Sequence, residues 1–495
     1  MPPTSQSSTN DFDHLPVKSG GNEKDDNVDA ISERDPFAVY LEDSELPQSL
    51  STLRKWVTVI VVSAGALCVT CASSMAASTE DSISREFTVA KIVTILSISL
   101  FVIGLGIGPL IVGPLSEVYG RNIVYQVSYA TFFAFTFPVA FAPNISVHLI
   151  FRFITGFCGS AFLSVAGGSV GDLFSDANVA GPMAVYTMSP FIGPVLGPLI
   201  SGFINQNASW RWTYYVLLIW SFCELVALIV LVPETYLPLL LKMKSAKLRQ
   251  STGDSRYWVP LDHENKDLRK AIIISCCKPF QLVLFDRMAL LLDLWTSLIL
   301  GILYLAFQAF PIIFMTKHQF NMQETGLTFL GIGLGMVIGV SSQPLWNRAY
   351  KKRASSSGGK LPPEDLLLMG EVGAILIPLG LIWLAFTTYK GVPWIIPIIA
   401  SIPFGTGTFF VFTSTFTYLV VAYRPIAASA MAANSALRSS FAAAFPLFAG
   451  AMYHRLGTVG ATALLAGLTA IMAPLPFIFR RIGADLRRKS RFAAH

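Results

Sequence analysis

Long apolar stretches alternate with shorter polar segments along the whole chain after residue 50. Each stretch has about 20 residues or more, enough for a helix rising 1.5 Å per residue to cross a bilayer core of about 30 Å. A helix satisfies its own backbone hydrogen bonds in lipid, so the pattern predicts an all-α membrane protein with twelve spans. The predicted spans are residues 57–77, 89–112, 123–142, 145–170, 183–204, 213–232, 290–315, 325–345, 366–388, 393–420, 425–452 and 458–479.

Polar segments divide these spans into two groups of six. The sequence predicts a disordered cytosolic tail at 1–50, because that segment is rich in Asp, Glu, Ser and Pro. Six-helix bundles follow at 51–235 and 289–480, and a second cytosolic tail at 481–495. The segment between the bundles, 236–288, contains a basic cluster that is expected either to lie along anionic lipid or to be a plain linker.

The distribution of positive charge predicts the orientation of the spans. With both termini in the cytosol, 28 of the 36 Lys and Arg residues fall in the termini and inner loops, five in outer loops and three within spans. Positive charge on the inner side orients membrane proteins during insertion. The net charge of +6 therefore reflects topology and not nucleic-acid binding. The two Asn-x-Ser sequons, at Asn144 and Asn207, fall in predicted outer loops and are candidate glycosylation sites.

The two halves carry related loops, which predicts an internal repeat. Residues 113–121 read Gly-Pro-Leu-Ser-Glu-Val-Tyr-Gly-Arg between spans 2 and 3, and residues 343–351 read Gln-Pro-Leu-Trp-Asn-Arg-Ala-Tyr-Lys between spans 8 and 9. Both segments place Pro-Leu at the end of a predicted helix, and both end with a basic residue. Two six-helix repeats that rock about a shared site would give alternating access.

The first of these loops resembles the signature of the major facilitator superfamily, through Gly113, Leu115, Glu117, Gly120 and Arg121. The resemblance implies the fold of that superfamily, with two pseudo-symmetric bundles. Glu117 is expected to form a latch by accepting charged hydrogen bonds from a neighbouring base or a helix N-terminus. The acid is Glu where the family usually has Asp, so a weaker latch is expected.

Arg152 in span 4 matches a second signature of the superfamily, together with Gly156 and Gly159. A charge at the centre of a membrane is costly and is seldom without a role. Arg152 is expected to hold a hydrogen-bond network that responds to proton binding. The alternative is an arginine that backbone carbonyls fix in place for packing alone.

Span 5 has three prolines and three glycines within residues 189–202, arranged around a repeated Gly-Pro. This pattern resembles the signature of exporters in the superfamily and implies a kinked, leak-proof seam. Further pieces resemble the fungal branch of the twelve-span drug:proton antiporters: residues 210–212, 233–236, 310–311, 433–439, 445–448 and 452–453. The seam residues are Pro190, Gly193, Pro194, Gly197, Pro198 and Gly202.

A proton-coupled exporter needs a carboxylate whose affinity for a proton changes with burial and with a nearby cation. Asp293 is the favoured candidate, because span 7 borders the cavity in the superfamily; the alternative for Asp293 is a surface position near the inner end. Glu224 and Glu371 are further carboxylates within spans. The predicted proton-coupling or gating residues are Glu117, Arg121, Arg152, Asp293 and Arg438.

The resemblance also indicates which residues line the substrate cavity. The candidates are polar or aromatic and come from spans 7, 10 and 11: Tyr304, Gln308, Phe310, Phe409, Thr413, Tyr418 and Asn434. As a set they predict an apolar, aromatic pocket with few fixed charges, which suits varied amphipathic ligands.

The sequence therefore predicts a secondary active exporter of drugs, toxins or secondary metabolites, acting as a monomer in the plasma membrane or the vacuolar membrane. No phosphate-binding loop or metal-ligand spacing occurs in the sequence, so we expect no enzyme activity, no cofactor and no metal, with the proton gradient as the energy source. Two alternatives remain open: an importer or facilitator of a polyamine or organic acid with the same fold, and a transporter-like membrane sensor.

Overall fold

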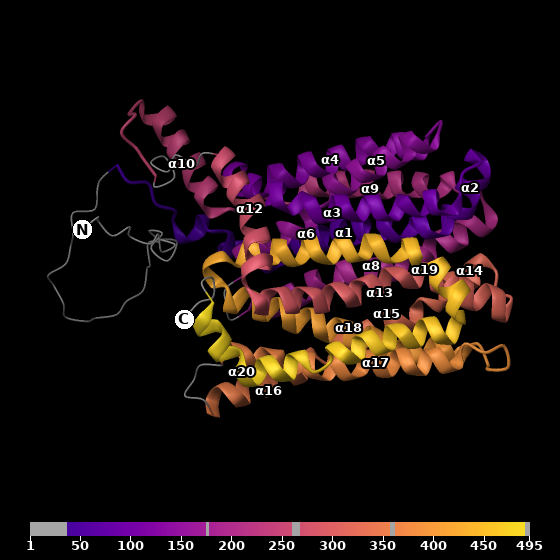
Figure 1. The fold of residues 1–495 in the computed structure, drawn as a ribbon. Helices are drawn as coiled ribbons and strands as arrows, with labels where there is room; N and C mark the ends of the chain where they lie inside the picture. The colour runs from indigo at the N-terminus through magenta and orange to yellow at the C-terminus, as the bar shows by residue number, and fades with distance from the viewer. Residues whose placement is uncertain (1–36, 175–177, 260–267, 357–361, 491–495) are drawn as a thin grey trace, which may run out of the picture.

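The computed structural model describes residues 37–174, 178–259, 268–356 and 362–490. Its long helices lie side by side in two groups, one from each half of the chain (Figure 1). Within these residues, eleven helical stretches are long and apolar enough to cross a membrane. The last, Ala427–Arg488, contains two spans, because Gly457 leaves the helical conformation at φ 71°. The predicted all-α fold is confirmed, and the helices are consistent with twelve spans.

The N-terminal bundle forms the upper group in Figure 1. Its fourth span is built from three consecutive helices, α5 to α7, which together cover Ile145–Leu173. The helices are α1 (Thr52–Met75), α3 (Lys91–Tyr119), α4 (Arg121–Ala140), α5 (Ile145–Gly159), α6 (Ala161–Ser164), α7 (Ala166–Leu173), α8 (Ala180–Asn207) and α9 (Arg211–Leu231).

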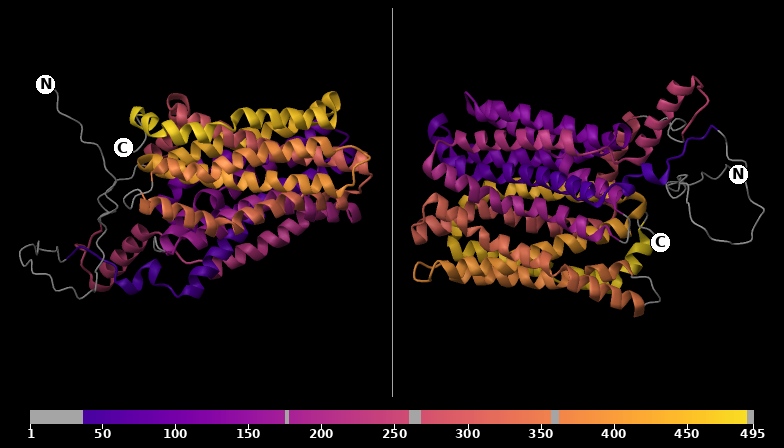
Figure 2. Two further views of the ribbon diagram at one scale, coloured as in Figure 1. Left: turned by 90° about the horizontal axis from the view of Figure 1, so that it is seen from below. Right: turned by 180° about the vertical axis from the view of Figure 1, so that it is seen from behind.

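The C-terminal bundle forms the lower group, and the same division is seen from below and from behind (Figure 2). Its second span is also divided, into α14, α15 and α16, whereas the second span of the N-terminal bundle is the single helix α3. The helices are α13 (Arg287–His318), α14 (Met322–Thr328), α15 (Leu330–Ser341), α16 (Gln343–Ser356), α17 (Leu368–Thr387), α18 (Ile395–Ala422), α19 (Ala427–Met472) and α20 (Leu475–Lys489).

Shorter helices connect the spans or lie at the ends of the molecule. Helices α10, α16 and α20 lie at one end and α2 and α14 at the other (Figure 1). Following the orientation predicted from charge, we name these the inner end and the outer end. The connecting elements are η2 (Asp43–Glu45), η3 (Pro47–Ser49), η4 (Ala76–Thr79), α2 (Glu80–Phe87), α10 (Leu237–Thr252), α12 (Leu268–Phe285), η5 (Pro363–Leu367) and η6 (Arg424–Ile426).

Short polar side chains fix where several spans begin. The Asp286 carboxylate accepts hydrogen bonds from the backbone N–H groups of Met288 and Ala289 and so caps α13. Asn144 caps α5 through Val147 N–H, and Asn321 forms a capping box with Glu324 at α14. These caps satisfy N–H groups that the helix itself leaves unpaired.

The segment that precedes α1 packs against the linker between the bundles. Val39 and Leu41 are buried with Leu241 and Val259, and the backbones of residues 37–39 and Trp258 exchange two hydrogen bonds. The structure therefore differs from the predicted disordered tail at residues 37–49; residues 1–36 lie outside the described part. A hydrogen bond from Lys244 lowers the pKa of Glu45 from its ordinary value and adds a charged contact.

The linker is helical in its described parts. Helix α10 carries the basic cluster and packs on the N-terminal segment, while α12 contacts α3 of one bundle and α13 and α19 of the other. Residues 260–267 of the predicted linker lie outside the described part. The predicted C-terminal tail also begins later than residue 480, because α20 continues to Lys489 and Arg487 pairs with Glu364 at 2.7 Å. The contact of the linker with lipid stays a prediction.

Candidate functional site

The signature residue Arg121 lies at the first turn of α4, where the chain enters from Gly120. Its guanidinium contacts Asp172 of α7 at 3.5 Å and donates to the Ser116 hydroxyl at 2.9 Å. Glu117 is exposed, and no hydrogen bond or ion pair joins it to another residue of the described chain. The acid that pairs with Arg121 in this structure is therefore Asp172, and the contact expected of Glu117 is absent from this conformation.

A carboxylate that sequence reasoning did not assign caps the same helix. Glu234 accepts hydrogen bonds from the backbone N–H groups of Arg121 and Asn122 at 3.0 and 3.1 Å. It also accepts from the N–H groups of Thr235 and Tyr236. An anion in this position satisfies unpaired donors and the positive end of the helix dipole. The Pro-Glu-Thr-Tyr motif was the sequence signal, but it gave no indication of a partner 113 residues away.

Arg152 is fully buried inside the N-terminal bundle. Its Nε donates to the Ser97 carbonyl at 3.0 Å and its Nη2 to the Ala72 carbonyl at 3.1 Å, and the guanidinium lies over the Phe101 ring at 4.3 Å. These are the backbone-carbonyl contacts of the alternative in which Arg152 is fixed for packing. They also tie α5 to α3 and α1, so a displaced Arg152 would loosen three spans at once.

Helix α8 carries the residues of the predicted seam and packs against protein on two sides, while the kink and the leak-proof role stay predictions. It is unbroken from Ala180 to Asn207 despite its three prolines. A Cβ added to Gly193 would lie 2.0 Å from Thr70 Oγ1, and one added to Gly197 would lie 2.9 Å from the Cys71 carbonyl. The absent side chains let α8 approach α1 closely, as in other membrane helix pairs with small residues at the interface.

The outer half of α8 contacts the other bundle. A Cβ on Gly202 would lie 2.9 Å from the Met322 carbonyl, and one on Gly326 would lie 2.6 Å from the Pro198 carbonyl. Nearer the middle, the rings of Phe191 and Phe412 stack with centroids 5.0 Å apart. The seam residues Pro190 and Pro194 lie in the same continuous helix.

Three of the predicted coupling and cavity residues come together in the C-terminal bundle. Asp293 on α13 is 1% exposed, and its Oδ1 accepts a hydrogen bond from the Asn434 side chain of α19 at 2.9 Å. The alternative of a surface position for Asp293 is therefore wrong. Asn434 also donates to Thr296 Oγ1 at 2.8 Å. One turn further along α19, Arg438 lies over the Phe416 ring at 4.9 Å.

This cluster has unused hydrogen-bonding capacity. Asp293 Oδ2, Asn434 Oδ1 and Arg438 Nε are buried and have no hydrogen-bond partner among the described residues. A buried polar atom without a partner costs free energy, so it usually marks a site that another species occupies for part of the time. A proton on Asp293 Oδ2 would reduce this cost.

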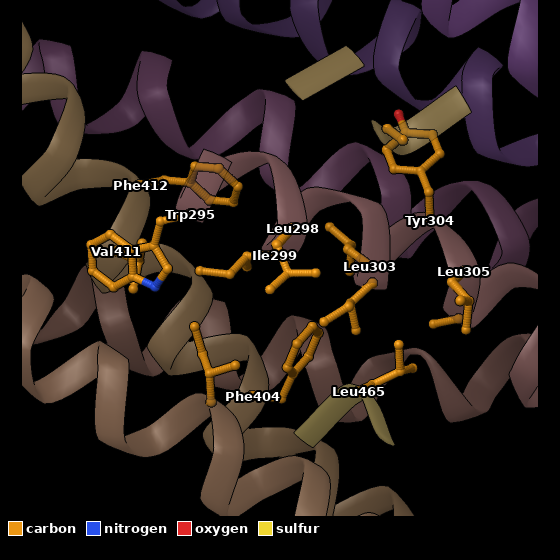
Figure 3. Packing of buried hydrophobic residues seen from close by; sticks show 14 of the residues in the cluster. Trp295, Leu298, Ile299, Leu303, Tyr304, Leu305, Phe404, Val411, Phe412 and Leu465 are labelled. Atoms are coloured by element: carbon orange, nitrogen blue, oxygen red, sulfur yellow. The ribbon is translucent and has the colours of Figure 1, made fainter. Parts of the chain in front are cut away.

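Three hydrogen bonds join α13 to the N-terminal bundle, one to α1 and two to the first residue of α2. The hydroxyls of Ser73 and Tyr304 lie 2.9 Å apart, and Gln308 Nε2 donates to both oxygens of Glu80 at 2.7 and 2.9 Å. Figure 3 shows Tyr304 leaving the apolar core of the C-terminal bundle toward the helices of the other half. No feature of the sequence pointed to the burial of Glu80, which is 3% exposed.

A cavity of about 360 Å³ lies between the bundles at the outer end. Gln308 and Glu80 line it, with apolar side chains that include Phe307 and Phe329. The cavity differs from the predicted pocket: its lining includes the charged residues Glu80, Asp81 and Lys91, and of the predicted cavity residues only Gln308 lines it.

Three of the predicted cavity residues belong instead to the interior of the C-terminal bundle. Phe310 packs on Phe329 and lines a second, very small cavity inside that bundle. Phe409 packs with Met369 and Phe410, and the Tyr418 hydroxyl contacts Met288 Sδ. Aromatic residues in a span fill cores as readily as cavities, so the sequence alone could not separate the two.

The remaining predicted residues are placed as follows. Thr413 is half-buried on α18, and its Oγ1 has no hydrogen-bond partner within the described residues. Asn144 and Asn207 are exposed at the outer end. Glu371 pairs with Arg480 at 2.7 Å, whereas Glu224 Oε1 is buried without a partner in the described part. No group of three or more His, Cys, Asp or Glu side chains in that part could hold a metal ion.

Comparisons with known proteins agree with this architecture. The family model of the Major Facilitator Superfamily matches residues 62–446. Among solved structures, the xylose transporter XylE from E. coli superposes with a TM-score of 0.60 over 87% of this chain and 98% of that one, at 15% identity. The human organic anion transporter MFSD10 gives a TM-score of 0.56 over 85% and 99%, at 18% identity.

Curated relatives from fungi are closer in sequence. Efflux pump atB of Aspergillus terreus is 48% identical over 79% of this chain and 83% of its own length. The probable drug/proton antiporter YHK8 of Saccharomyces cerevisiae is 40% identical, over 91% and 88%. The multidrug transporter mdrA of Aspergillus fumigatus is 37% identical, over 94% and 77%. With these matches and with two helical bundles joined by a linker, the chain belongs to the Major Facilitator Superfamily.

Proposed function

We propose that this protein is a secondary active exporter that moves amphipathic small molecules out of the cell in exchange for protons. The relatives at 36–48% identity carry this proposal, because their names describe efflux pumps and a probable drug/proton antiporter. The cavity between the bundles supports it, since a site lined by both halves can open to either side when the halves tilt.

The proton would bind at Asp293. Its side chain is buried, one oxygen is engaged by Asn434, and the other has no partner in the described chain. Arg438, one turn from Asn434, faces the aromatic rings of α18 and would stabilise the ionised form of Asp293 when the two approach. Protonation and substrate binding would then favour opposite orientations of the bundles.

The helix α8 seam would resist ion leakage during this movement, because its glycines allow direct contact with α1 and with α14. Arg152 would keep the N-terminal bundle rigid through its carbonyl contacts. The protein would use the proton gradient and no cofactor, act as a monomer, and lie in the plasma membrane with both termini in the cytosol.

Transport by the purified full-length protein in liposomes tests the proposal. Radiolabelled fluconazole serves as a neutral probe and rhodamine 6G as a cationic one. We expect an imposed pH gradient to drive uphill movement of at least one probe, and a protonophore to abolish it. Flux down the substrate gradient alone would indicate a facilitator, and the absence of flux for every probe tried would favour the sensor. In cells, accumulation instead of depletion would identify an importer.

A further inference from the structure

The outer cavity draws its walls from both bundles. Helix α3 contributes Ile95, α13 contributes Phe307 and Gln308, and α14 and α19 add Thr325 and Leu447. Its volume of about 360 Å³ lies within the range of small-molecule sites. Because both bundles line it, any movement between them changes its shape.

One ionisable group is buried in this wall. Glu80, at the start of α2, is 3% exposed, and both of its oxygens accept from the Gln308 amide. No Lys or Arg side chain of the described residues lies within ion-pair distance of it. Lys91, the cation of the cavity lining, is paired with Asp81 at 2.9 Å, and both of those side chains are about half exposed at the rim.

The Glu80 carboxylate hydrogen-bonds only a neutral amide, and the nearby cation Lys91 is already paired with Asp81. Such a buried carboxylate is costly unless a cation or a proton joins it. A carboxylate has about four acceptor positions, so the bonds from Gln308 leave room for a further donor. The surrounding phenylalanine, isoleucine and leucine side chains favour an apolar body attached to that donor.

We propose that the outer cavity binds a monovalent organic cation, with its charged nitrogen beside Glu80 and its apolar part against Phe307 and Phe329. This inference rests on the proposed export function and narrows its cargo to compounds with a positively charged amine. The cavity is then the site from which the cation leaves at the outer end. Separation of the bundles would break the Glu80–Gln308 contact as the cation is released.

Calorimetric binding to the purified protein in detergent tests the site without requiring transport. The probe is 2-phenylethylammonium, whose N–H groups can donate to Glu80, and propylbenzene, its neutral carbon analogue of nearly the same shape, is the matched ligand control. We expect the cation to bind the unaltered protein at least about tenfold more tightly than the neutral analogue. Glu80→Gln should weaken cation binding by about tenfold or more, since a charged partner is lost from a buried pair. Glu80→Asp should restore part of it.

The matched control variant is Glu224→Gln, the same change at a buried carboxylate that does not line the cavity. It should leave the cation affinity unchanged. Gln308→Lys is a second test variant that keeps the Glu80 carboxylate. The lysine ammonium would neutralise Glu80, so we expect this variant to lose affinity for the cation probe.

Equal affinities for the two ligands, or undiminished cation binding by both Glu80→Gln and Gln308→Lys, would overturn the inference. The experiments can exclude the proposed export function and the proposed cation site independently of each other. Cation binding that depends on Glu80 without proton-driven flux would remove the export function alone. Export of fluconazole by a protein that does not bind the cation would remove this site alone.

Discussion

At the scale of single residues, the two charges buried deepest in the bundles are stabilised in opposite ways. Arg152 directs its donors to the Ser97 and Ala72 carbonyls, which cannot change protonation. Asp293 keeps one oxygen free of partners in the described chain and lies beside Asn434, which also bonds Thr296. The first arrangement suits a permanent support, and the second suits a group that gains and loses a proton.

Replacement of Asp293 by Asn should abolish export driven by a pH gradient, while the protein stays folded. The amide has nearly the shape of the carboxyl group but cannot bind and release a proton, so coupling should fall by more than about tenfold. The measurement is uphill flux in liposomes. Exchange of labelled for unlabelled substrate at equal pH on both sides is the control and should persist. Normal pH-driven export by this variant would exclude Asp293 from the mechanism.

Gly120 should tolerate no side chain. Its φ of 92° is a conformation that L-residues rarely adopt, and an added Cβ would lie 2.5 Å from Glu234 Oε2. We expect Gly120→Ala to cost about 1–3 kcal/mol and to lower the unfolding temperature in detergent. Gly113→Ala, in the same loop motif, is the control: nothing lies within 4 Å of its Cβ position. Equal unfolding temperatures for the two variants would contradict this account of the turn.

The sequence predicted individual residues best where the residue type alone is unusual for its setting. A charge inside a span led to Arg152, Asp293 and Arg438, and the structure buries Asp293 beside Asn434. The partner of Arg121 could not be predicted, because Asp172 and Glu234 are distant in the chain and ordinary for an inner surface. Phe409 and Tyr418 were predicted to line the cavity but lie in the core, for a different reason. Aromatic residues occur on several faces of the span, so the sequence did not show which face borders the cavity.

At the scale of elements, α8 shows how small residues substitute for the hydrophobic effect in lipid. Apolar helices gain little by leaving lipid for each other, so close packing must bring them together. Gly193 and Gly197 provide that approach on the α1 side, and Gly202 provides it toward α14. The hydroxyl of Ser74 also donates to the Gly193 carbonyl at 3.3 Å.

A methyl group at Gly197 should separate α8 from α1. Its Cβ would lie 1.9 Å from Ser74 Oγ and 3.0 Å from the Met75 backbone nitrogen, so backbone would have to move. We expect Gly197→Ala to destabilise the protein by about 1–3 kcal/mol, as overpacking does. Gly181→Ala in the same helix, where nothing lies within 4 Å, should have no such effect. Thermal unfolding and proton leak of the liposomes are the readouts; unchanged values for Gly197→Ala would contradict the seam.

The spans predicted from hydropathy fall on the long apolar helices of the structure, because length and apolarity are local properties of the sequence. The connecting helices were harder to predict. Helix α2 and the N-terminal segment at 37–49 are largely polar. The structure of the N-terminal segment depends on tertiary partners such as Leu241 and Val259. The boundary between the last two spans was predicted near residue 457 and coincides with the backbone break at Gly457.

At the scale of the whole molecule, the bundles are joined at the outer end by side-chain hydrogen bonds. The side chain of Gln206 at the end of α8 accepts from Met322 N–H of α14 at 3.1 Å. Ser73 of α1 and Glu80 of α2 form hydrogen bonds with Tyr304 and Gln308 of α13. These contacts must separate when the cavity opens outward.

Cross-linking across this contact should stop transport. In the double variant Gln206→Cys/Met322→Cys, a short bifunctional methanethiosulfonate reagent would join α8 to α14 and prevent the outer ends from parting. We expect flux to fall by the cross-linked fraction and to return on reduction. Each single cysteine variant is the control and should keep its flux with the same reagent. Full flux through completely cross-linked protein would show that the outer ends need not separate.

The pairing of Val39 and Leu41 with Leu241 and Val259 also constrains how the protein is made. Residues 37–41 leave the ribosome before the first span, whereas their partners emerge after the sixth. Residues 37–41 therefore lack their apolar partners while the first six spans enter the bilayer. Their docking on α10 then becomes the event that marks the completed first half during synthesis.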